Sequence, residues 1–301
     1  VGADAVVNNL RGHLPAKLGL DYAALSQIKP SIVCLHISAY GRDNERASWP
    51  GYDFLMQAEA GLMSLTGEPD GPPARFGPSV VDCMTGMTGV VGLLSALLAA
   101  RAGGKGCDVD TCLFDVALHQ LSYTATWYLN HGQVSTRLER SAHFSAAPVQ
   151  TFPTADGWIF VMCMTDRFWE ALLGVMGRGG LATDPRFATA TIRHRNRAAL
   201  AEILDAEFRL ATTADWLGRL AGLLPVAPVH DLREALDSEF VRRTGMVESV
   251  PHPECGNLRV LASPIKIDGE RPARSACSGA GADGDAVMGT TNPAILRKTE
   301  G

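Results

Sequence analysis

Apolar and polar residues are distributed along the first third of the chain in short runs typical of alternating strands and helices. Apolar runs at DAVVNN (4–9), SIVCLHIS (31–38) and CDVDTCL (107–113) predict buried strands. A helical stretch around residues 22–28, which Pro30 ends, separates the first two runs and predicts a βαβ unit. Such a unit favours a parallel sheet with its ligand site at the carboxyl ends of the strands.

Two longer helical patterns lie between the second and third of these runs, and another follows the third. Residues 52–65 carry apolar side chains at helical spacing, and SVVDCMTGMTGVVGLLSALLAAR (79–101) predicts a long helix. The apolar run from Val90 to Ala100 is shorter than a membrane span, so we expect a buried helix. Another apolar helix is predicted over residues 116–129.

The pattern changes near residue 135, where a polar, irregular stretch begins. TFPTADGWIFVMCM (151–164) predicts a hairpin, three amphipathic helices follow up to Leu224, and strands and loops return after Phe240. Residues 275–285 have a flexible composition. The resulting prediction is an α/β protein in three parts: a large domain over 1–135, a small α+β domain over 136–240, and a return to the large domain over 241–301.

Composition narrows the classes of function. A chain of 301 residues with 46% hydrophobic residues can bury a large core, and its net charge of −5 provides no general basic field for nucleic acid or anionic membranes. The seven cysteines form no CxxC pair, so we expect reduced thiols in a cytoplasmic protein and no metal site. The N-terminus lacks both a secretory signal and an initiating Met, so we expect the natural start to be missing.

Asp82 is the one acid in the long apolar segment, and it allows two interpretations. Locally it is typical of an N-cap that accepts hydrogen bonds from the first turn. The small residues after it, among them Gly86 and Gly89, would also let a ligand approach that turn, although tight helix packing explains them equally well.

Over nearly its whole length the chain resembles the family III CoA-transferases, the group that includes formyl-CoA transferase and the related α-methylacyl-CoA racemases. Each matching piece alone is weak, but their order and spacing make the match specific. The pieces are NNLRGHLPAKLGLDYAAL, SIVCLHISAYG, GYDFLMQAEAGLMSLTG, VVDCMTGMTGVVGLLSALLAAR, GKGCDVDTCLFDVAL, PVQTFPTADGWIFV, DPRFAT and PHPECGNLRV.

The resemblance implies a Rossmann-like large domain that binds CoA, and a homodimer whose two subunits are interlocked. Members of the family begin with a strand, a glycine-containing turn and a helix that contribute part of the CoA site. This chain begins after those elements. We therefore expect the large domain to be incomplete at its N-terminus.

In the family, the Asp at the position of Asp82 is the nucleophile. Its carboxylate attacks an acyl-CoA, and the reaction passes through a mixed anhydride and an aspartyl-CoA thioester before CoA reaches a free carboxylic acid. Coenzyme A is a substrate here, and no permanent cofactor or metal is expected. From the sequence, the free N–H groups at the start of the helix are candidates to stabilise the oxyanion.

Tyr52 and Asp53 match a family segment that lines the reacting centre. The racemases carry a His where Tyr52 stands, and a tyrosine hydroxyl with an ordinary pKa near 10 is a poor replacement for it. A transferase is therefore favoured over a racemase. The alternative for Tyr52 is a core tyrosine with a satisfied hydroxyl.

Five residues near the N-terminus match family positions for CoA or carry charge that suits its phosphates. Asn9, Leu10, Lys17 and Leu18 correspond to contact positions, and Arg11 and Lys17 are candidates for phosphate binding. As surface cations they would need no further explanation. Besides transfer of CoA, two hypotheses stay open: racemisation of an α-methylacyl-CoA, and a truncated member that keeps the fold without activity.

Overall fold

The computed structural model describes residues 2–252, 254–279, 281–282 and 284. Residues up to Pro228 form one compact unit, and residues from Val229 onwards form a second. The finer division at residues 135 and 240 stays a prediction.

The first unit contains a parallel sheet made from the three predicted strands. β1 (Ala5–Asn8), β2 (Val33–Ser38) and β3 (Asp108–Cys112) lie in the order β1-β2-β3. Both pairings are parallel, with Asn8 opposite His36 and His36 opposite Asp110. The α/β class and the parallel sheet are therefore confirmed, and the central strand β2 is almost wholly buried.

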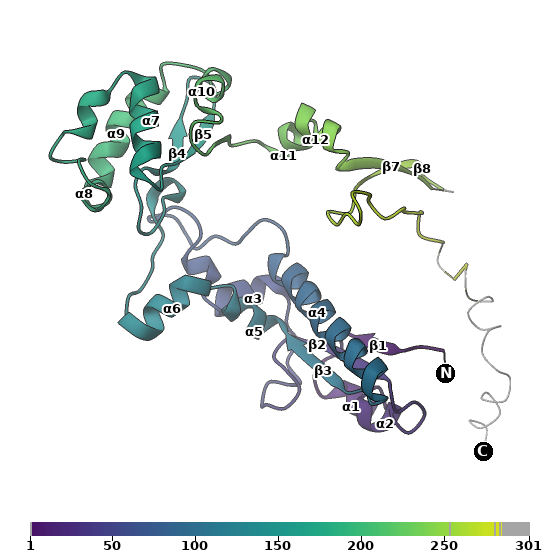
Figure 1. The fold of residues 1–301 in the computed structure, drawn as a ribbon. Helices are drawn as coiled ribbons and strands as arrows, with labels where there is room; N and C mark the ends of the chain where they lie inside the picture. Colours follow the sequence, from purple (N-terminus) through teal and green to yellow (C-terminus); the bar gives the residue numbers. More distant parts are fainter. Residues whose placement is uncertain (1, 253, 280, 283, 285–301) are drawn as a thin grey trace. The chain divides into compact units, whose positions relative to one another are not determined.

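The helix α4 (Val80–Gly103) packs on one face of this sheet (Figure 1). Two glycines permit the close approach: a Cβ on Gly89 would lie 3.2 Å from Leu35 Cδ2, and one on Gly92 would lie 2.8 Å from Val109 Cγ1. The opposite side of α4 is apolar and exposed. The large apolar side chains of α4 that are exposed are Met87, Val90, Val91, Leu94 and Leu98.

The long helix predicted over 79–101 is confirmed, since α4 extends from Val80 to Gly103. The expectation that this helix is buried was wrong, because it buries only the side that faces the sheet. By length and composition alone α4 could cross a membrane, although core helices of soluble proteins pass the same test.

Two other predicted helices are interrupted. The helix expected over 52–65 ends as α3 (Asp53–Glu59), because Gly61 takes a left-handed conformation with φ +89°, and a 3-10 turn, η1 (Leu62–Ser64), follows. The helix expected over 116–129 is α5 (Leu113–His119) and α6 (Ser122–His131), with a break at Ser122. Two short helices, α1 (Leu14–Lys17) and α2 (Tyr22–Leu25), precede β2.

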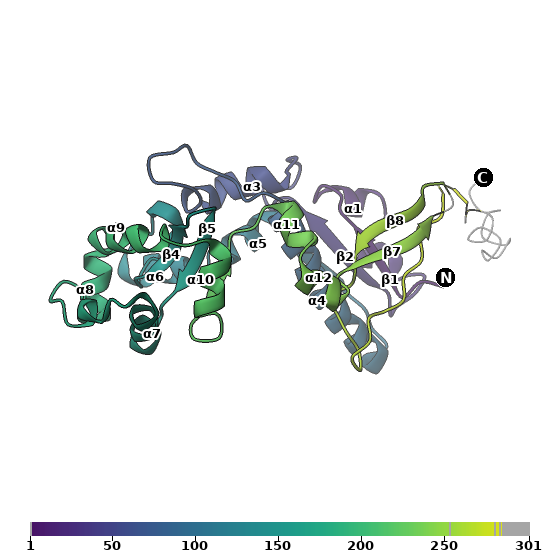
Figure 2. The same cartoon turned by 90° about the horizontal axis from the view of Figure 1, so that it is seen from above.

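A second, antiparallel sheet follows in the same unit. β4 (Val149–Pro153) and β5 (Trp158–Met162) form the predicted hairpin, and β6 (Val226–Pro228) pairs with β5. Helices surround this sheet (Figure 2) and bury a core that includes Phe152, Trp169 and Phe208. They are α7 (Asp166–Met176), α8 (Ala190–Arg195), α9 (Arg197–Phe208) and α10 (Thr213–Leu220), with 3-10 turns η2 (Glu139–Ser141) and η3 (Gly179–Ala182).

The second unit is small. It contains α11 (Leu232–Leu236), α12 (Glu239–Thr244) and the antiparallel pair β7 (Val247–His252) and β8 (Gly256–Leu261). The stretch 275–285, predicted to be flexible, lies partly outside the described residues.

Candidate active site

Asp82 lies in the first turn of α4, close to the carboxyl ends of the parallel strands. The helix begins at Val80, and Ser79 occupies the N-cap position without a side-chain capping bond. Asp82 is therefore the third residue of the helix, and the interpretation of Asp82 as its N-cap was wrong. Its side chain is exposed and accepts no hydrogen bond from any residue that the structure describes.

The start of α4 is capped instead by Asp53, the first residue of α3. One carboxylate oxygen of Asp53, Oδ2, accepts hydrogen bonds from the backbone N–H groups of Val81 (2.6 Å) and Asp82 (3.0 Å). The other, Oδ1, accepts one from Gln57 Nε2 at 2.5 Å. Asp53 is only 3% exposed. A buried carboxylate thus holds the backbone of Asp82 in place.

Each of the first four backbone N–H groups of α4 already donates a hydrogen bond. The N–H of Val80 donates to Pro78 O at 2.9 Å, and that of Cys83 donates to Ser79 O at 3.2 Å. The two between them donate to Asp53. The hypothesis that free N–H groups here stabilise an oxyanion is therefore contradicted, because all four already have acceptors.

The surroundings raise the pKa of the Asp82 carboxyl above its ordinary value. Partial desolvation is the main cause, and the charge of the neighbouring Asp53 adds to it. A carboxylate of higher pKa is a stronger base and, in general, a better nucleophile.

Asp82 opens into a cavity of about 550 Å³ at the carboxyl end of the parallel sheet. This is the edge where α/β sheets bind their ligands. The walls come from the turn after β1, the end of β2, the loop before α3 and the first turns of α4. The lining residues are Asn9, Leu10, Arg11, Ile37, Ser38, Ala39, Trp49, Pro50, Gly51, Tyr52, Asp82, Thr85, Gly86 and Leu113.

The structure brings together five of the eight residues that the sequence predicts for the site. Asn9, Leu10, Arg11, Tyr52 and Asp82 all line the cavity. Tyr52 is 75% exposed, so the alternative of a core tyrosine is wrong.

The other three lie elsewhere. Asp53 is buried and is not among the lining residues. Lys17, at the end of α1, and Leu18, its C-cap, are exposed and also outside the lining. Roles for Lys17 and Leu18 in CoA binding stay predictions.

Trp49 is a lining residue that sequence reasoning missed. Its loop is held by Arg46, whose guanidinium lies 4.8 Å from the Trp49 ring centroid and 5.2 Å from that of Tyr40. Arg46 also forms an ion pair with Glu59, to which the Tyr40 hydroxyl donates at 2.8 Å. The sequence does contain a cation and two aromatic residues close together, Arg46 with Tyr40 and Trp49. Their cation–π contacts become evident only in the folded chain.

Among the described residues, no group of three or more His, Cys, Asp or Glu side chains is placed to hold a metal ion.

Comparison with known proteins identifies the class to which this fold and site belong. A profile of CoA-transferase family III matches residues 1–283. The chain therefore belongs to CoA-transferase family III.

Similar proteins agree with this assignment. The chain is 31% identical to the succinate–glutarate CoA-transferase of Agrobacterium fabrum over 81% of its own length and 61% of that protein. It is 33% identical to the acetyl-CoA:oxalate CoA-transferase of Acetobacter aceti over 90% of its own length and 70% of that protein. The chain thus spans about 60 to 70% of the length of these curated relatives.

Solved structures share the fold. A CaiB/BaiF family protein from Brucella suis is 32% identical and superimposes with a TM-score of 0.81, covering 95% of this chain and 75% of that protein.

Proposed function

We propose that this chain carries the reacting centre of a CoA-transferase, which moves CoA from an acyl-CoA to a free carboxylic acid. The observation that carries the proposal is the Asp82 carboxylate, which is exposed, lines the same cavity as Arg11 and Tyr52, and is hydrogen-bonded to no described residue. A carboxylate left without partners in a ligand-sized cavity is available to react. Membership of CoA-transferase family III supports this assignment.

In the proposed reaction, Asp82 acts as a covalent nucleophile. One oxygen attacks the thioester carbonyl, the C–S bond breaks, and the products are a mixed anhydride and the CoA thiolate. The thiolate then attacks the aspartyl carbonyl and expels the donor carboxylate, which leaves an aspartyl-CoA thioester. The acceptor carboxylate attacks this thioester, and the same two steps in reverse return CoA as the new acyl-CoA.

Other cavity residues assist these steps. Because the first-turn N–H groups of α4 already have acceptors, the oxyanion needs side-chain donors, and we assign this role to the Tyr52 hydroxyl and the Asn9 amide. Arg11 offers a planar fork of donors for a phosphate or a carboxylate. Asp53 acts on Asp82 through the helix start, so we propose that it is a positioning residue.

The racemase alternative has less support. It needs an acid/base partner able to exchange a proton with the substrate α-carbon near neutral pH, for which histidine is suited. Within the described part of the chain no histidine lines the cavity. By the family resemblance, Tyr52 stands where the racemases have a histidine.

For the wider setting we keep the implications of the family resemblance. We propose that the chain works as an interlocked homodimer in the cytoplasm, that CoA thioesters and small carboxylic acids are its substrates, and that it uses no resident cofactor. The names of the relatives make succinyl-CoA the first donor to test, against a panel of mono- and dicarboxylates.

Trapping of the covalent intermediate tests the proposal. After incubation with an acyl-CoA, hydroxylamine should convert the aspartyl thioester to a hydroxamate, and mass spectrometry of peptides should locate the modification at Asp82. We expect Asp82→Ala to abolish both the label and the transfer of CoA, since among the residues that the structure describes no other carboxylate lines the cavity.

The control is Cys83→Ser, which removes the exposed thiol next to Asp82. This variant should label and turn over like the parent chain. Full transferase activity in Asp82→Ala would refute the proposal.

A further inference from the structure

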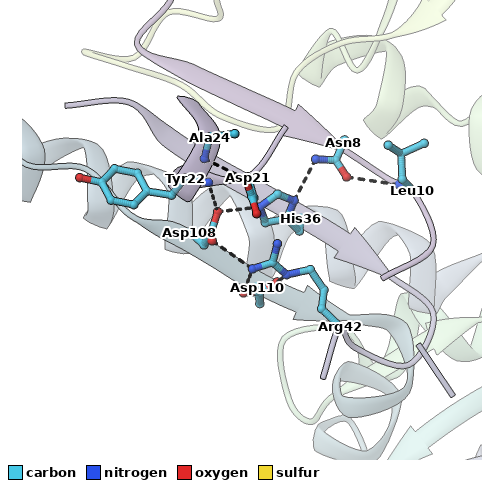
Figure 3. Close-up of polar contacts among 9 residues, drawn as sticks. All are labelled: Asn8, Leu10, Asp21, Tyr22, Ala24, His36, Arg42, Asp108 and Asp110. Carbon is cyan, nitrogen blue, oxygen red and sulfur yellow. Dashed lines mark hydrogen bonds and ion pairs between the residues drawn. The ribbon is translucent and has the colours of Figure 1, made fainter. Parts of the chain in front are cut away.

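His36 is a buried histidine that the proposed reaction does not use. It lies in the middle of β2 and is 1% exposed. Strand alternation points it to the sheet face opposite α4, because its neighbours Leu35 and Ile37 pack against α4 at Gly89. Both ring nitrogens have partners: Nδ1 lies 2.9 Å from Asn8 Nδ2, and Nε2 lies 2.8 Å from Asp108 Oδ1 (Figure 3).

These contacts define the tautomer of His36. The side-chain oxygen of Asn8 accepts the backbone N–H of Leu10 at 3.4 Å, so its amide NH₂ group faces the histidine. An amide NH₂ can only donate, and Nδ1 must therefore be the unprotonated acceptor. The ring proton lies on Nε2 and is donated to Asp108. His36 is thus linked to one acceptor, Asp108, and one donor, Asn8.

Asp108 anchors the other end of this chain of hydrogen bonds. It also accepts the backbone N–H of Tyr22 at 2.8 Å and Arg42 Nη2 at 3.1 Å. Desolvation opposes ionisation of Asp108, but the hydrogen bonds from His36, Tyr22 and Arg42 outweigh it and lower its pKa. A charged acceptor with several donors forms a strong, well-oriented anchor.

The chain of hydrogen bonds ends at the wall of the candidate active site. Asn8 is the last residue of β1, and Asn9, Leu10 and Arg11 directly after it line the cavity. The far end of this turn is held by packing, since a Cβ on Gly12 would lie 2.1 Å from Gly41 O. With Asn8 tied to His36, both ends of the turn 9–11 are fixed.

We propose that His36 is a positioning residue for the CoA-binding wall: its Nε2–H tautomer, oriented by Asp108, holds Asn8 and so fixes the turn 9–11 at the cavity. The inference rests on the proposed function in naming CoA as the ligand. The link from Asp108 to Leu10 does not depend on that assignment. Without the hydrogen bond from Asn8 to His36, the turn 9–11 would be free to move. Binding of CoA would then have to order this turn, and the affinity for CoA would fall.

Two substitutions each keep one half of the histidine. In His36→Asn, the amide oxygen takes the approximate place of Nδ1 and accepts from Asn8, while the bond to Asp108 is lost. In His36→Gln, the amide nitrogen takes the approximate place of Nε2 and donates to Asp108, while Asn8 loses its acceptor. Both should lower the free energy of unfolding, so stability alone does not distinguish a positioning role from a structural one.

Two measurements distinguish a positioning role from a structural one: the affinity for CoA and the hydrogen exchange of the Leu10 amide. We expect His36→Gln to raise the Kd for CoA in calorimetry, and the KM for acyl-CoA, about tenfold, equivalent to about 1.4 kcal/mol, with kcat nearly unchanged. His36→Asn should stay close to the parent chain. Amide hydrogen exchange at Leu10 should be faster only in His36→Gln, and long-range ¹H–¹⁵N NMR of the parent should find the His36 proton on Nε2.

A matched control is His131→Gln, which changes an exposed histidine at the end of α6. It should leave all of these measurements as in the parent chain. Equal effects of His36→Asn and His36→Gln on CoA affinity and on Leu10 exchange would overturn the proposal, as would a proton on Nδ1. If the parent chain binds no CoA, the proposed function fails instead, and Leu10 exchange with the NMR tautomer still decides whether His36 holds the turn.

Discussion

At the scale of single residues, the neighbouring carboxylates Asp53 and Asp82 divide two tasks between them. Asp53 is buried, and its two carboxylate oxygens accept hydrogen bonds from Val81, Asp82 and Gln57. The side chain of Asp82 is exposed and has no hydrogen-bond partner among the described residues. A fully bonded carboxylate is well suited to hold a backbone, and an unbonded one to react. The charge of Asp53 also raises the pKa of Asp82, so the positioning group influences the reactivity of the other.

An exchange of carboxylate and amide between positions 53 and 57 tests this division. In Asp53→Asn the new NH₂ group faces Gln57 Nε2, so two donors meet, and we expect the free energy of unfolding to fall by about 1 to 3 kcal/mol. Adding Gln57→Glu should restore it, because the introduced carboxylate can accept from the introduced amide and from the N–H of Phe76, which Gln57 Oε1 accepts now at 2.8 Å. Urea denaturation measures both. Equal stability of the single and the double variant would contradict the assigned hydrogen bonds.

For the single variant Asp53→Asn we also expect a change in the pH dependence of kcat/KM. Since desolvation and Asp53 raise the pKa of Asp82, the acidic limb of kcat/KM should lie at higher pH than for an ordinary aspartate. Removing the charge of Asp53 lowers that pKa and should move the limb to lower pH. A pH–rate profile of CoA transfer measures the shift, and an unmoved limb would mean that Asp82 is not the titrating group.

At the scale of elements, α4 is the structural support of the site. Its glycines divide into those that face the sheet and those that do not. A Cβ on Gly92 would lie 2.8 Å from Val109 Cγ1, whereas one on Gly86 would have no atom within 4 Å. The close contact between α4 and the sheet therefore depends on some of the glycines and not on others.

Alanine substitutions should separate these two kinds of glycine. Gly86→Ala should raise the free energy of unfolding by roughly 0.5 to 1 kcal/mol, the usual gain for alanine in a helix interior. Gly92→Ala should lose this gain or fall below the parent, because Val109 must move. Thermal or urea unfolding measures the difference, and a larger stabilisation from Gly92→Ala would show that the packing is looser than the structure implies.

At the scale of the whole molecule, the exposed apolar side of α4 makes an isolated copy unfavourable. Five large apolar side chains on this side contact water, and a patch of this kind usually marks an interaction surface. We expect the chain to be a homodimer in solution, as the family resemblance implies. Sedimentation velocity over a range of dilutions measures this, and a folded, active monomer would contradict the expectation.

Much of the fold followed from local pattern. The strands at β1, β2 and β3, their parallel pairing and the hairpin of β4 and β5 all depend on runs and turns that are continuous in sequence. The breaks at Gly61 and Ser122 were missed, because an apolar pattern at helical spacing continues across a kink. The exposed side of α4 was missed because composition does not tell which side of an apolar helix is covered.

The candidate site divides in the same way. The resemblance to the family, which rests on the order of motifs along the chain, implied roles for Asp82, Tyr52 and residues 9–11, and these residues line one cavity in the structure. Three features became evident only in the tertiary structure. Asp53 caps α4, the N–H groups expected to be free already have acceptors, and His36 is hydrogen-bonded to Asn8 next to the cavity wall. Hydrogen bonds between residues 28 or more positions apart depend on how strands and helices meet, and that is a property of the folded chain.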